Sequence, residues 1–459
     1  MSSSVVMSRS PQHPDDIVAE VESASPDDVS RAADVARSAA RSWARLPAPA
    51  RARALDGAAS ALAEDRADFA ELVVREVGKP IDEAIGEVDR GIAILRYYAQ
   101  QVLDPIGENY APSGRGMLFT DRRPHGVAGL ITPWNFPVAI PLWKAAPALA
   151  FGNGVLLKPA PAATATAIRL AEIFDATLPS GLFHVLPGDA QTGTAVIASS
   201  DCVSFTGSAA VGASVAAAAA RQGIPVQAEM GGQNAVVVLD DVDPATAAAQ
   251  IIGGAFSYAG QKCTATRRVI VVGAGDDFLD AFTAAARSLV PTDPGTPGTV
   301  VGPVINQNAQ AAVVDAATQA SKDGGRVLAG GGAPYDDGWY VAPTILDGLA
   351  PDHPLCQEEV FGPLCTVHRV ADIASAVKIV NSVRYGLVTG VHTADLDRAL
   401  EVIDGVDTGM VKVNAPTAGV DFYLPFGGAK ASSYGTREQG KAARDFYTFT
   451  RTVTLAPMR

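Results

Sequence analysis

The sequence predicts an α/β protein built from two domains, each with a parallel sheet. Apolar stretches of strand length alternate with helical stretches from residue 127 to 221, and the same alternation begins again at residue 234. This pattern indicates parallel strands joined by helices that cover both faces of a sheet. The length of 459 residues also exceeds what one hydrophobic core normally supports. A final stretch, 446–455, in which threonine recurs at every second position, fits neither domain.

The N-terminal region is predicted to be mostly helical. We expect residues 1–16 to form a short mobile leader, because they are polar and lack the apolar stretch of a signal peptide. A short edge strand is expected at 17–21. Ser25 is a candidate N-cap, followed by a proline and two aspartates, and the composition of 25–101 predicts three or four helices.

The first predicted sheet begins after an interruption in the helical pattern. Residues 106–126 are rich in glycine, proline and charge, and we interpret them as an excursion from the domain. The repeating units that follow are predicted as strands at 127–132, 152–157, 183–186 and 202–205, with helices at 140–149, 168–177, 192–199 and 211–221.

The second domain repeats the pattern. Its loop at 291–303 is rich in proline and glycine. The alternating stretch 446–455 is expected to pair outside this domain, with the 106–126 excursion or with a neighbouring subunit. The strands of the domain are expected at 234–239, 269–272, 326–328, 340–345, 366–370, 389–392 and 409–413, and its helices at 244–258, 276–289, 306–322, 373–382 and 396–403.

Charge and cysteine content narrow the classes of partner. The chain has 49 acidic and 36 basic residues, a formal net charge of −13, which argues against nucleic acid or an anionic membrane surface as partner. Its four cysteines form no CxxC pair and have no histidine at ligand spacing, so neither a disulfide framework nor a metal site is expected. No apolar run reaches membrane-spanning length. We therefore expect a soluble, cytoplasmic protein with a small-molecule partner.

Two glycine-containing segments resemble phosphate sites. At 203–212 a strand runs into a helix through glycines, which is typical either of a phosphate held by helix N-terminal amides or of a simple tight turn. The segment 435–442 spells GxxxxGK, but it has Ala442 where a P-loop needs Ser or Thr, and no apolar strand precedes it. The sequence therefore excludes a P-loop.

Cys263 is the candidate nucleophile. It lies in the turn Gly260-Gln261-Lys262-Cys263-Thr264-Ala265, just before an apolar strand, although a lone cysteine is also commonly a small core residue. A thiol that attacks a carbonyl needs an oxyanion donor and a base for later hydrolysis. Asn135, between prolines at a strand end, is the candidate donor, and Glu229, before two glycines, is the candidate base. Their alternative roles are a turn residue and an exposed or capping residue.

Taken together, these segments closely resemble the aldehyde dehydrogenase superfamily. The resemblance covers the chain from about residue 17 to the end, with the motifs in the family's order. The motifs are Pro133-Trp134-Asn135-Phe136-Pro137, Lys158-Pro159-Ala160, Phe205-Thr206-Gly207-Ser208, Glu229-Met230-Gly231-Gly232, Gly260-Gln261-Lys262-Cys263 and Glu358-Glu359-Val360-Phe361-Gly362-Pro363.

The resemblance implies a role for each candidate. Cys263 attacks the aldehyde, Asn135 and the Cys263 backbone N–H hold the oxyanion, and hydride passes to a nicotinamide cofactor. Glu229 then activates water to hydrolyse the thioester, and Lys144 and Glu438 match residues that relay protons from this base. A coenzyme A-acylating enzyme and a catalytically silent homologue are the alternatives, and the retained Glu229 argues against both.

The resemblance also implies a cofactor site and a domain division. A Rossmann-like NAD(P)-binding domain is expected at 1–105 and 125–231, a catalytic domain at 232–431, an oligomerisation arm at 106–124 and 446–459, and a return segment at 432–445. We expect a homodimer or homotetramer. The implied cofactor residues are Ile131, Thr132, Pro133, Trp134, Lys158, Ala160, Pro161, Gly188, Phe205, Thr206, Gly207, Ser208, Val211, Glu229, Gly231, Glu359 and Phe361.

Pro161 bears on the choice of cofactor. Members of the family often carry an acid at this position, bonded to the ribose hydroxyls. An acid there would repel a 2′-phosphate, so its absence predicts that both NAD and NADP are used, with a preference for NADP.

The segment from Val413 to Gly440 is similar to the α-ketoglutarate semialdehyde (2,5-dioxovalerate) dehydrogenases. Two positions depart from that pattern, because Lys262 and Ala429 stand where arginine is common. Lys262 can still meet a substrate carboxylate as a point charge. Another semialdehyde, or a general aliphatic or aromatic aldehyde, is the alternative substrate. The implied substrate pocket contains Phe136, Ile140, Trp143, Lys262, Thr264, Asp421 and Phe426.

Overall fold

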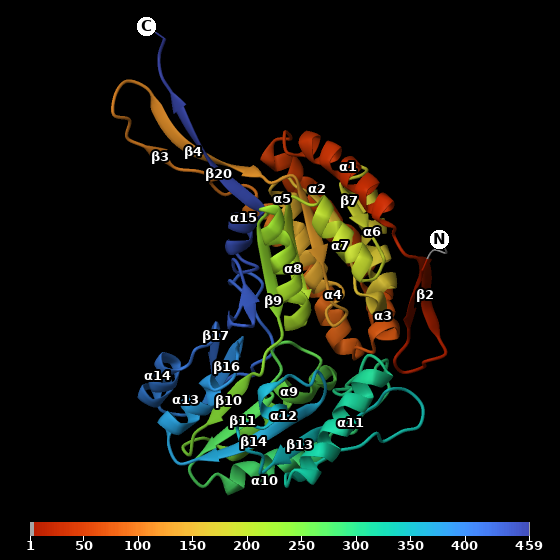
Figure 1. Ribbon diagram of the computed structural model, residues 1–459, viewed down its shortest axis with the longest axis vertical. Helices are drawn as coiled ribbons and strands as arrows, with labels where there is room; N and C mark the ends of the chain where they lie inside the picture. The colour runs from red at the N-terminus through yellow and green to blue at the C-terminus, as the bar shows by residue number, and fades with distance from the viewer. Residues whose placement is uncertain (1–3, 459) are drawn as a thin grey trace.

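The computed structural model describes residues 4–458 and arranges them in two lobes with a projecting arm (Figure 1). The upper lobe holds the N-terminal helices and one sheet, and the lower lobe holds a second sheet. The arm extends from the upper lobe and contains the C-terminal strand. The predicted fold class, two α/β domains with an additional β element, is confirmed.

The first domain contains a six-stranded sheet in the order β19-β9-β8-β5-β6-β7. All of its strands are parallel except β19. Strands β5 and β6 are buried along their whole length, as expected for a sheet covered by helices on both faces. Its elements are α1 (Pro26–Trp43), α2 (Ala48–Glu64), α3 (Arg66–Val77), α4 (Ile81–Gln101), β5 (Val127–Ile131), α5 (Ala139–Ala150), β6 (Gly154–Lys158), η1 (Pro161–Ala163), α6 (Thr164–Thr177), β7 (Phe183–Val185), α7 (Ala190–Ser199), β8 (Cys202–Gly207), α8 (Ala209–Gln222), β9 (Val226–Met230) and β19 (Ser433–Tyr434).

The second domain contains a seven-stranded sheet in the order β12-β13-β14-β11-β10-β16-β17, in which only β12 is antiparallel. Its central strands β10 and β11 are fully buried. Its elements are β10 (Ala235–Val238), α9 (Pro244–Phe256), η2 (Ser257–Gly260), β11 (Arg268–Val272), α10 (Asp276–Ser288), α11 (Gln307–Lys322), β12 (Arg326–Ala329), β13 (Thr344–Asp347), α12 (Pro354–Gln357), β14 (Leu364–Val370), α13 (Ile373–Asn381), β15 (Tyr385–Gly386), β16 (Val388–His392), α14 (Leu396–Gly405), β17 (Met410–Val413) and β18 (Ala429–Lys430).

The arm is a three-stranded antiparallel sheet in the order β20-β4-β3. After the short helix α15 (Ala442–Tyr447), β20 (Thr448–Leu455) pairs with β4 (Met117–Pro124) over eight residues, and β3 (Asn109–Tyr110) pairs with the other edge of β4. The alternating C-terminal stretch therefore pairs with the 106–126 excursion, one of the two partners that the sequence predicts.

The N-terminal leader is ordered within the described residues, contrary to the sequence-based expectation. Strand β1 (Val5–Arg9) pairs antiparallel with β2 (Ile17–Glu22), the predicted edge strand. The side chains of Ser8 and Ser10 are buried against the first domain. A polar sequence can form a strand when a partner strand and a packing surface lie beside it, and neither is visible from composition.

The sequence pattern also misses β9 and misplaces β13. Strand β9 contains Gln227 and Glu229, which interrupt its apolar pattern although both are buried. The strand predicted at 340–345 begins only at Thr344, directly after Pro343, which has no N–H to donate to a strand ladder.

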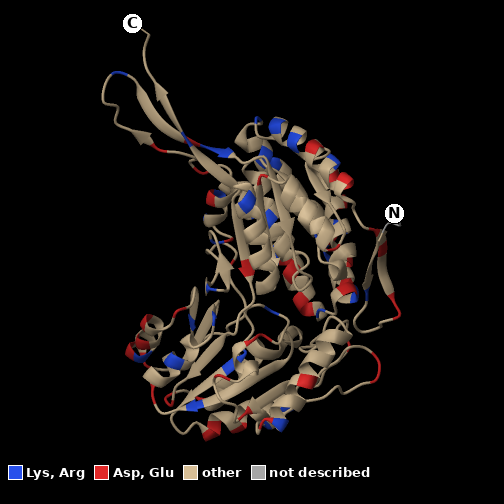
Figure 2. Cartoon of the chain, viewed as in Figure 1, with Lys and Arg blue, Asp and Glu red and all other residues tan. Residues whose placement is uncertain are grey.

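Acidic and basic side chains are interspersed along α1 and over the helices of the second domain (Figure 2). Among residues 4–458, no helix is long and apolar enough to cross a membrane. In the same part of the chain, no group of three or more His, Cys, Asp or Glu side chains is arranged to hold a metal ion.

Candidate functional site

Two cavities meet at Cys263, between the two domains. The first, of about 340 Å³, lies at the carboxyl ends of β5, β8 and β9, where parallel α/β sheets bind ligands. The second, of about 300 Å³, lies between α4 and the loop around Val420. Both are lined by Cys263, Trp143 and Phe426, so the thiol is accessible from two directions.

The backbone around Cys263 is held rigidly. Buried Arg267 donates to the carbonyl oxygens of Gly260 at 2.6 Å and Gly362 at 2.5 Å. Asn234 donates to the carbonyl oxygens of Cys263 and Ala265, each at 2.8 Å. Gly260 has a φ of +65°, and a Cβ there would lie 2.5 Å from the carbonyl oxygen of Gly362. These contacts fix the backbone on both sides of Cys263.

The Cys263 thiol is protonated at neutral pH in the free protein. Burial, followed by the charges of Glu359 and Glu229, raises its pKa to about 12. The other three cysteines, Cys202, Cys356 and Cys365, are buried in the domain cores, whereas Cys263 is partly exposed. Cys263 is therefore the cysteine that a substrate can reach.

Asn135 lies beside the nucleophile loop. Its side-chain nitrogen donates to the carbonyl oxygen of Gln261 at 2.9 Å. Gln261 is itself held, because it donates to the Pro303 carbonyl at 3.1 Å and accepts from the Ile305 N–H at 2.8 Å. The Asn135 amide has two N–H groups, so one is left for an oxyanion.

Glu229, on β9, lines the first cavity. Ser433 donates a hydrogen bond to its Oε2, whereas its buried Oε1 has no partner among the described residues. Burial, and next the charge of Glu438, raise the pKa of Glu229 well above its ordinary value. A carboxylate with one free oxygen and a raised pKa is suited to take a proton from water.

Lys144 and Glu438 form a buried ion pair close to this base. Trp143 donates to Glu438 at 2.8 Å, and Lys144 donates to Ser204 at 2.7 Å. The charges of Lys144 and Glu438 both act on the pKa of Glu229, in opposite directions. The structure thus brings the five predicted catalytic residues together.

The first cavity fits a nicotinamide cofactor. Eight of the predicted cofactor residues besides Glu229 line it: Pro133, Trp134, Thr206, Gly207, Ser208, Gly231, Glu359 and Phe361. In this lining the Thr206 hydroxyl and Oε1 of Glu359 have no hydrogen-bond partner among the described residues, although Arg267 lies 4.0 Å from that Oε1. The buried hydroxyl of Thr132, directly after β5, is likewise without one. A Cβ at Gly231 would lie 2.0 Å from Oε2 of Glu359, so the glycine is what lets Glu359 approach. Unpaired polar groups around a cavity indicate a polar ligand.

The remaining predicted cofactor residues lie around this cavity, outside its lining. Ile131 and Lys158 end β5 and β6, and Phe205 lies near the end of β8. The N-terminus of α8 follows Ser208, whose hydroxyl accepts from the Val211 N–H. After β6, Ala160 caps η1 and Pro161 opens it, and Gly188 lies in the loop after β7. All of them lie in or after the carboxyl ends of neighbouring strands.

The predicted substrate residues divide between the two cavities. Phe136, Lys262 and Thr264 line the second cavity, and Ile140 lines the first. Asp421 lines neither and is exposed, because the loop turns Gly419 and Val420 toward the cavity instead.

Lys262 is already paired with an acid. Its ammonium contacts Glu83 at 2.8 and 3.0 Å and Ser257 at 2.7 Å. An ammonium has three donors, and the bonds to Glu83 and Ser257 engage two of them, while the Glu83 carboxylate balances its charge.

Four residues of the site were not predicted from the sequence. Ser433 contacts Glu229, and the α4 residues Glu83, Glu87 and Arg90 line the second cavity. The signal for the α4 residues is their spacing, since 83, 87 and 90 fall on one helical face. Ser433 has no such signal.

Comparison with known proteins identifies the family of the chain. The aldehyde dehydrogenase family profile matches residues 2–453. The α-ketoglutaric semialdehyde dehydrogenase of Bacillus subtilis is 38% identical over 99% of this chain and 96% of the relative. The α-ketoglutarate semialdehyde dehydrogenase of Haloferax volcanii is 40% identical, covering 96% and 94%.

Two solved structures have the same fold. The NAD-dependent aldehyde dehydrogenase of Sinorhizobium meliloti has a TM-score of 0.95 and 31% identity, covering 99% of this chain and 93% of that one. The 3,6-anhydro-L-galactose dehydrogenase in complex with NADP has a TM-score of 0.95 and 28% identity, covering 99% and 96%. The chain therefore belongs to the aldehyde dehydrogenase family and is an oxidoreductase that acts on aldehydes.

Proposed function

We propose that the protein oxidises α-ketoglutarate semialdehyde to α-ketoglutarate with NAD(P)⁺ as the oxidant. The observation that carries this proposal is the position of Cys263, where a cavity suited to a cofactor meets one suited to a substrate. The names of the two curated relatives support the choice of substrate.

The chemistry begins at Cys263. Glu229 takes the thiol proton through its free Oε1, the sulfur adds to the aldehyde carbon, and the resulting oxyanion accepts hydrogen bonds from the Asn135 amide and the Cys263 backbone N–H. A nicotinamide held by the residues that line the first cavity would supply the hydride acceptor that oxidation of the hemithioacetal on Cys263 to a thioester requires. Glu229 then takes a proton from water, which attacks the thioester and releases the acid and the thiol. Glu438 and Lys144 adjust the charge around Glu229 and pass its proton on.

Steady-state kinetics with a panel of aldehydes test the proposed substrate. The panel contains α-ketoglutarate semialdehyde, succinate semialdehyde, glyceraldehyde and benzaldehyde, and NAD(P)H absorbance is the readout. We expect the highest kcat/KM for α-ketoglutarate semialdehyde and no turnover by Cys263→Ala. A tenfold higher kcat/KM for any other aldehyde of the panel would reject the substrate assignment.

For the cofactor, we propose that both NAD and NADP are used, with a preference for NADP. Pro161 supports this, because it opens the 3-10 turn η1 without placing a charge there. Lys158 ends β6, three residues before Pro161. Burial lowers the pKa of Lys158, and the charge of Asp189 only partly opposes this effect. A kcat/KM at least a hundredfold higher with NAD would reject this preference.

For the oligomer, we propose that the arm joins subunits into a homodimer or homotetramer. Large apolar side chains on its three strands are exposed, including Tyr110, Met117, Phe449 and Leu455. Exposed apolar side chains on a projecting sheet favour burial against a partner. Light scattering on the full chain tests this, with Met117→Ser/Phe449→Ser expected to yield a smaller particle. An unchanged mass would reject the role of the arm.

A further inference from the structure

One face of α4 forms a wall of the second cavity. Glu83, Gly86, Glu87 and Arg90 recur at intervals of three, one and three residues, which places them on the same side of a helix. This wall faces Cys263 and Thr264 across the cavity. A Cβ at Gly86 would have no atom within 4 Å, so the glycine leaves open space in the middle of the wall.

Both acids of this wall are already neutralised. Glu83 is paired with Lys262 at 2.8 Å. Glu87 is paired with buried Lys79 and also accepts from the N–H groups of Val138 at 2.8 Å and Ala139 at 2.9 Å. Neither carboxylate is free to balance another positive charge in the cavity.

Arg90, in contrast, makes no ion pair or side-chain hydrogen bond with any described residue, although it is half-buried. Lys412, on whose pKa the charge of Arg90 acts, is engaged elsewhere, since it donates to the carbonyl oxygens of Ala418 at 2.9 Å and of Gly419. Burial lowers the pKa of Lys412; the charge of Asp421 raises it, and the smaller effect of Arg90 lowers it. Arg90 thus contributes one uncompensated positive charge to the cavity.

We propose that Arg90 binds the carboxylate of the substrate and so makes the enzyme selective for aldehydes that carry an acid at the far end. A guanidinium offers a planar pair of donors that matches a carboxylate, and it keeps its charge throughout the working pH range. The inference rests on the proposed oxidation of an acidic semialdehyde. It assigns to Arg90 the carboxylate contact that the sequence suggests for Lys262, because Glu83 already balances the charge of Lys262.

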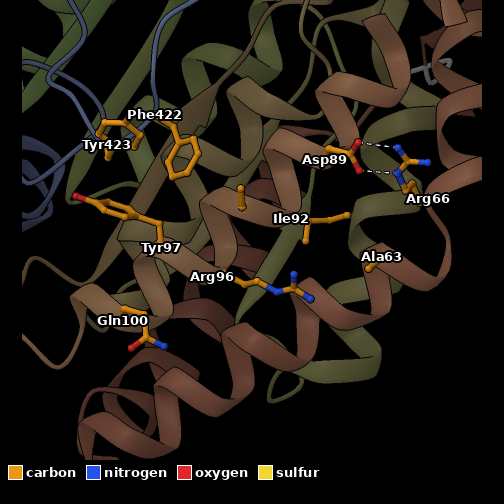
Figure 3. A pocket seen from close by; sticks show the side chains of 10 residues that line it. Ala63, Arg66, Asp89, Ile92, Arg96, Tyr97, Gln100, Phe422 and Tyr423 are labelled. Atoms are coloured by element: carbon orange, nitrogen blue, oxygen red, sulfur yellow. Dashed lines mark hydrogen bonds and ion pairs between the residues drawn. The ribbon is translucent and has the colours of Figure 1, made fainter. Parts of the chain in front are cut away.

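The chain offers a matched control on the same helix. Arg96 lies in a separate pocket with Asp89, Ile92 and Tyr97 (Figure 3), and its nearest acid, Asp56, is 3.8 Å away. Arg96→Met removes the same charge from α4 as Arg90→Met, but outside the cavity that contains Cys263.

The experiment compares kcat/KM for α-ketoglutarate semialdehyde with that for pentanal, a neutral aldehyde of the same chain length. We expect Arg90→Met to lower the value for the acidic aldehyde by roughly 10- to 150-fold, the range of a charged hydrogen bond, and to change that for pentanal less than about threefold. For Arg90→Lys, kcat/KM for the acidic aldehyde should lie between those of the wild type and Arg90→Met, because lysine keeps the charge but not the paired donors. Arg96→Met should behave as the wild type.

A binding measurement provides a readout that does not depend on turnover. In a Cys263→Ala background, calorimetry should show that Arg90→Met weakens the binding of α-ketoglutarate by a similar factor. Equal losses with the acidic and the neutral aldehyde would mean that Arg90 only supports the fold, and retained selectivity in Arg90→Met would reject the proposal outright. If instead the wild type prefers pentanal, the proposed substrate itself is rejected, which distinguishes the two failures.

Discussion

The Ser433 hydroxyl donates a hydrogen bond of 2.5 Å to Oε2 of Glu229. The two residues face each other where β19 pairs antiparallel with β9. The same hydroxyl oxygen accepts from the Gly428 N–H at 2.6 Å, which orients its hydrogen toward the carboxylate. Ser433 therefore positions the Glu229 carboxylate and stabilises its charged form.

Replacing Ser433 by alanine should shift the pH profile of kcat to higher pH. The hydrogen bond lowers the pKa of Glu229, so its loss raises a pKa that burial and Glu438 already raise. Glu229 acts as a base only when deprotonated. The part of the profile in which kcat increases with pH therefore shifts to higher pH. A charged hydrogen bond of about 1.5–3 kcal/mol corresponds to a shift of about one to two pH units.

The control for this shift is Ser214→Ala, which removes a hydroxyl from α8 whose one hydrogen bond within residues 4–458 is to the Ala210 carbonyl. Its profile should match that of the wild type. If Ser433→Ala lowered kcat equally at every pH, the serine would have a structural role and not an electrostatic one.

The sequence identifies Glu229 but not Ser433, and the reason is the length of β19. A two-residue strand has no periodicity, and the bond joins residues 204 positions apart. Cys263, Asn135 and Glu229 each lie in a local motif that can be read without the fold. The repeated strand–helix units were likewise predictable, because each depends on the apolar pattern of its own stretch.

Lys262 illustrates the same limit for charges. From the sequence it is a free cation next to the nucleophile, and only the packing of α4 against the Cys263 loop brings in Glu83, 179 residues away. Long-range ion pairs depend on tertiary contacts that no local pattern encodes. Arg90 was missed for the opposite reason, because nothing in the sequence shows that a helical arginine lacks a partner.

The alkylation of Cys263 by iodoacetamide should keep accelerating as the pH increases from 7 to 9.5. Only the thiolate reacts with iodoacetamide. Because the pKa of Cys263 is about 12, the fraction of thiolate increases about tenfold per pH unit across this range. Mass spectrometry of the labelled peptide gives the rate. A rate that levels off near pH 9 would indicate an ordinary thiol pKa and contradict the burial effect.

Glu359→Gln provides the complementary test of this reactivity. After burial, the charge of Glu359 raises the pKa of Cys263 most. Removing that charge should therefore lower the pKa of Cys263. Labelling at pH 8 should therefore be faster in Glu359→Gln than in the wild type. A slower reaction would show that this carboxylate assists the thiol instead of suppressing its ionisation.

The buried pair of Lys79 and Glu87 should make Glu87→Gln strongly destabilising. Removing one partner of such a pair leaves an uncompensated buried charge and costs about 3–5 kcal/mol. Lys79→Met should cost less, because Glu87 keeps its bonds from the N–H groups of Val138 and Ala139. Calorimetric unfolding temperatures give the order of the two variants.

The defect of Glu87→Gln should also shrink as the pH increases. Burial lowers the pKa of Lys79, and Glu87 is the main group that opposes this effect. In Glu87→Gln the pKa of Lys79 should therefore be lower still. The unfolded chain then binds more protons than the folded one between the lowered pKa and the ordinary value near 10.4, and stability increases with pH in that window. A defect that grows with pH would contradict a buried, charged Lys79.

Placing an acid at position 161 should reverse the cofactor preference. Pro161 is exposed at the first position of η1, so a side chain there has room. In Pro161→Glu, the new carboxylate should repel the 2′-phosphate of NADP and accept hydrogen bonds from the ribose hydroxyls of NAD. We expect KM for NADP to increase at least tenfold, with KM for NAD equal or lower.

Pro161→Gln is the matched control, because it has the same shape without the charge and should leave the ratio of the two KM values near that of the wild type. The increase for NADP should also weaken in high salt, since it depends on repulsion between exposed charges. A similar increase in both variants would trace the effect to the loss of the proline ring, and the preference for NADP would then have another cause than the missing acid.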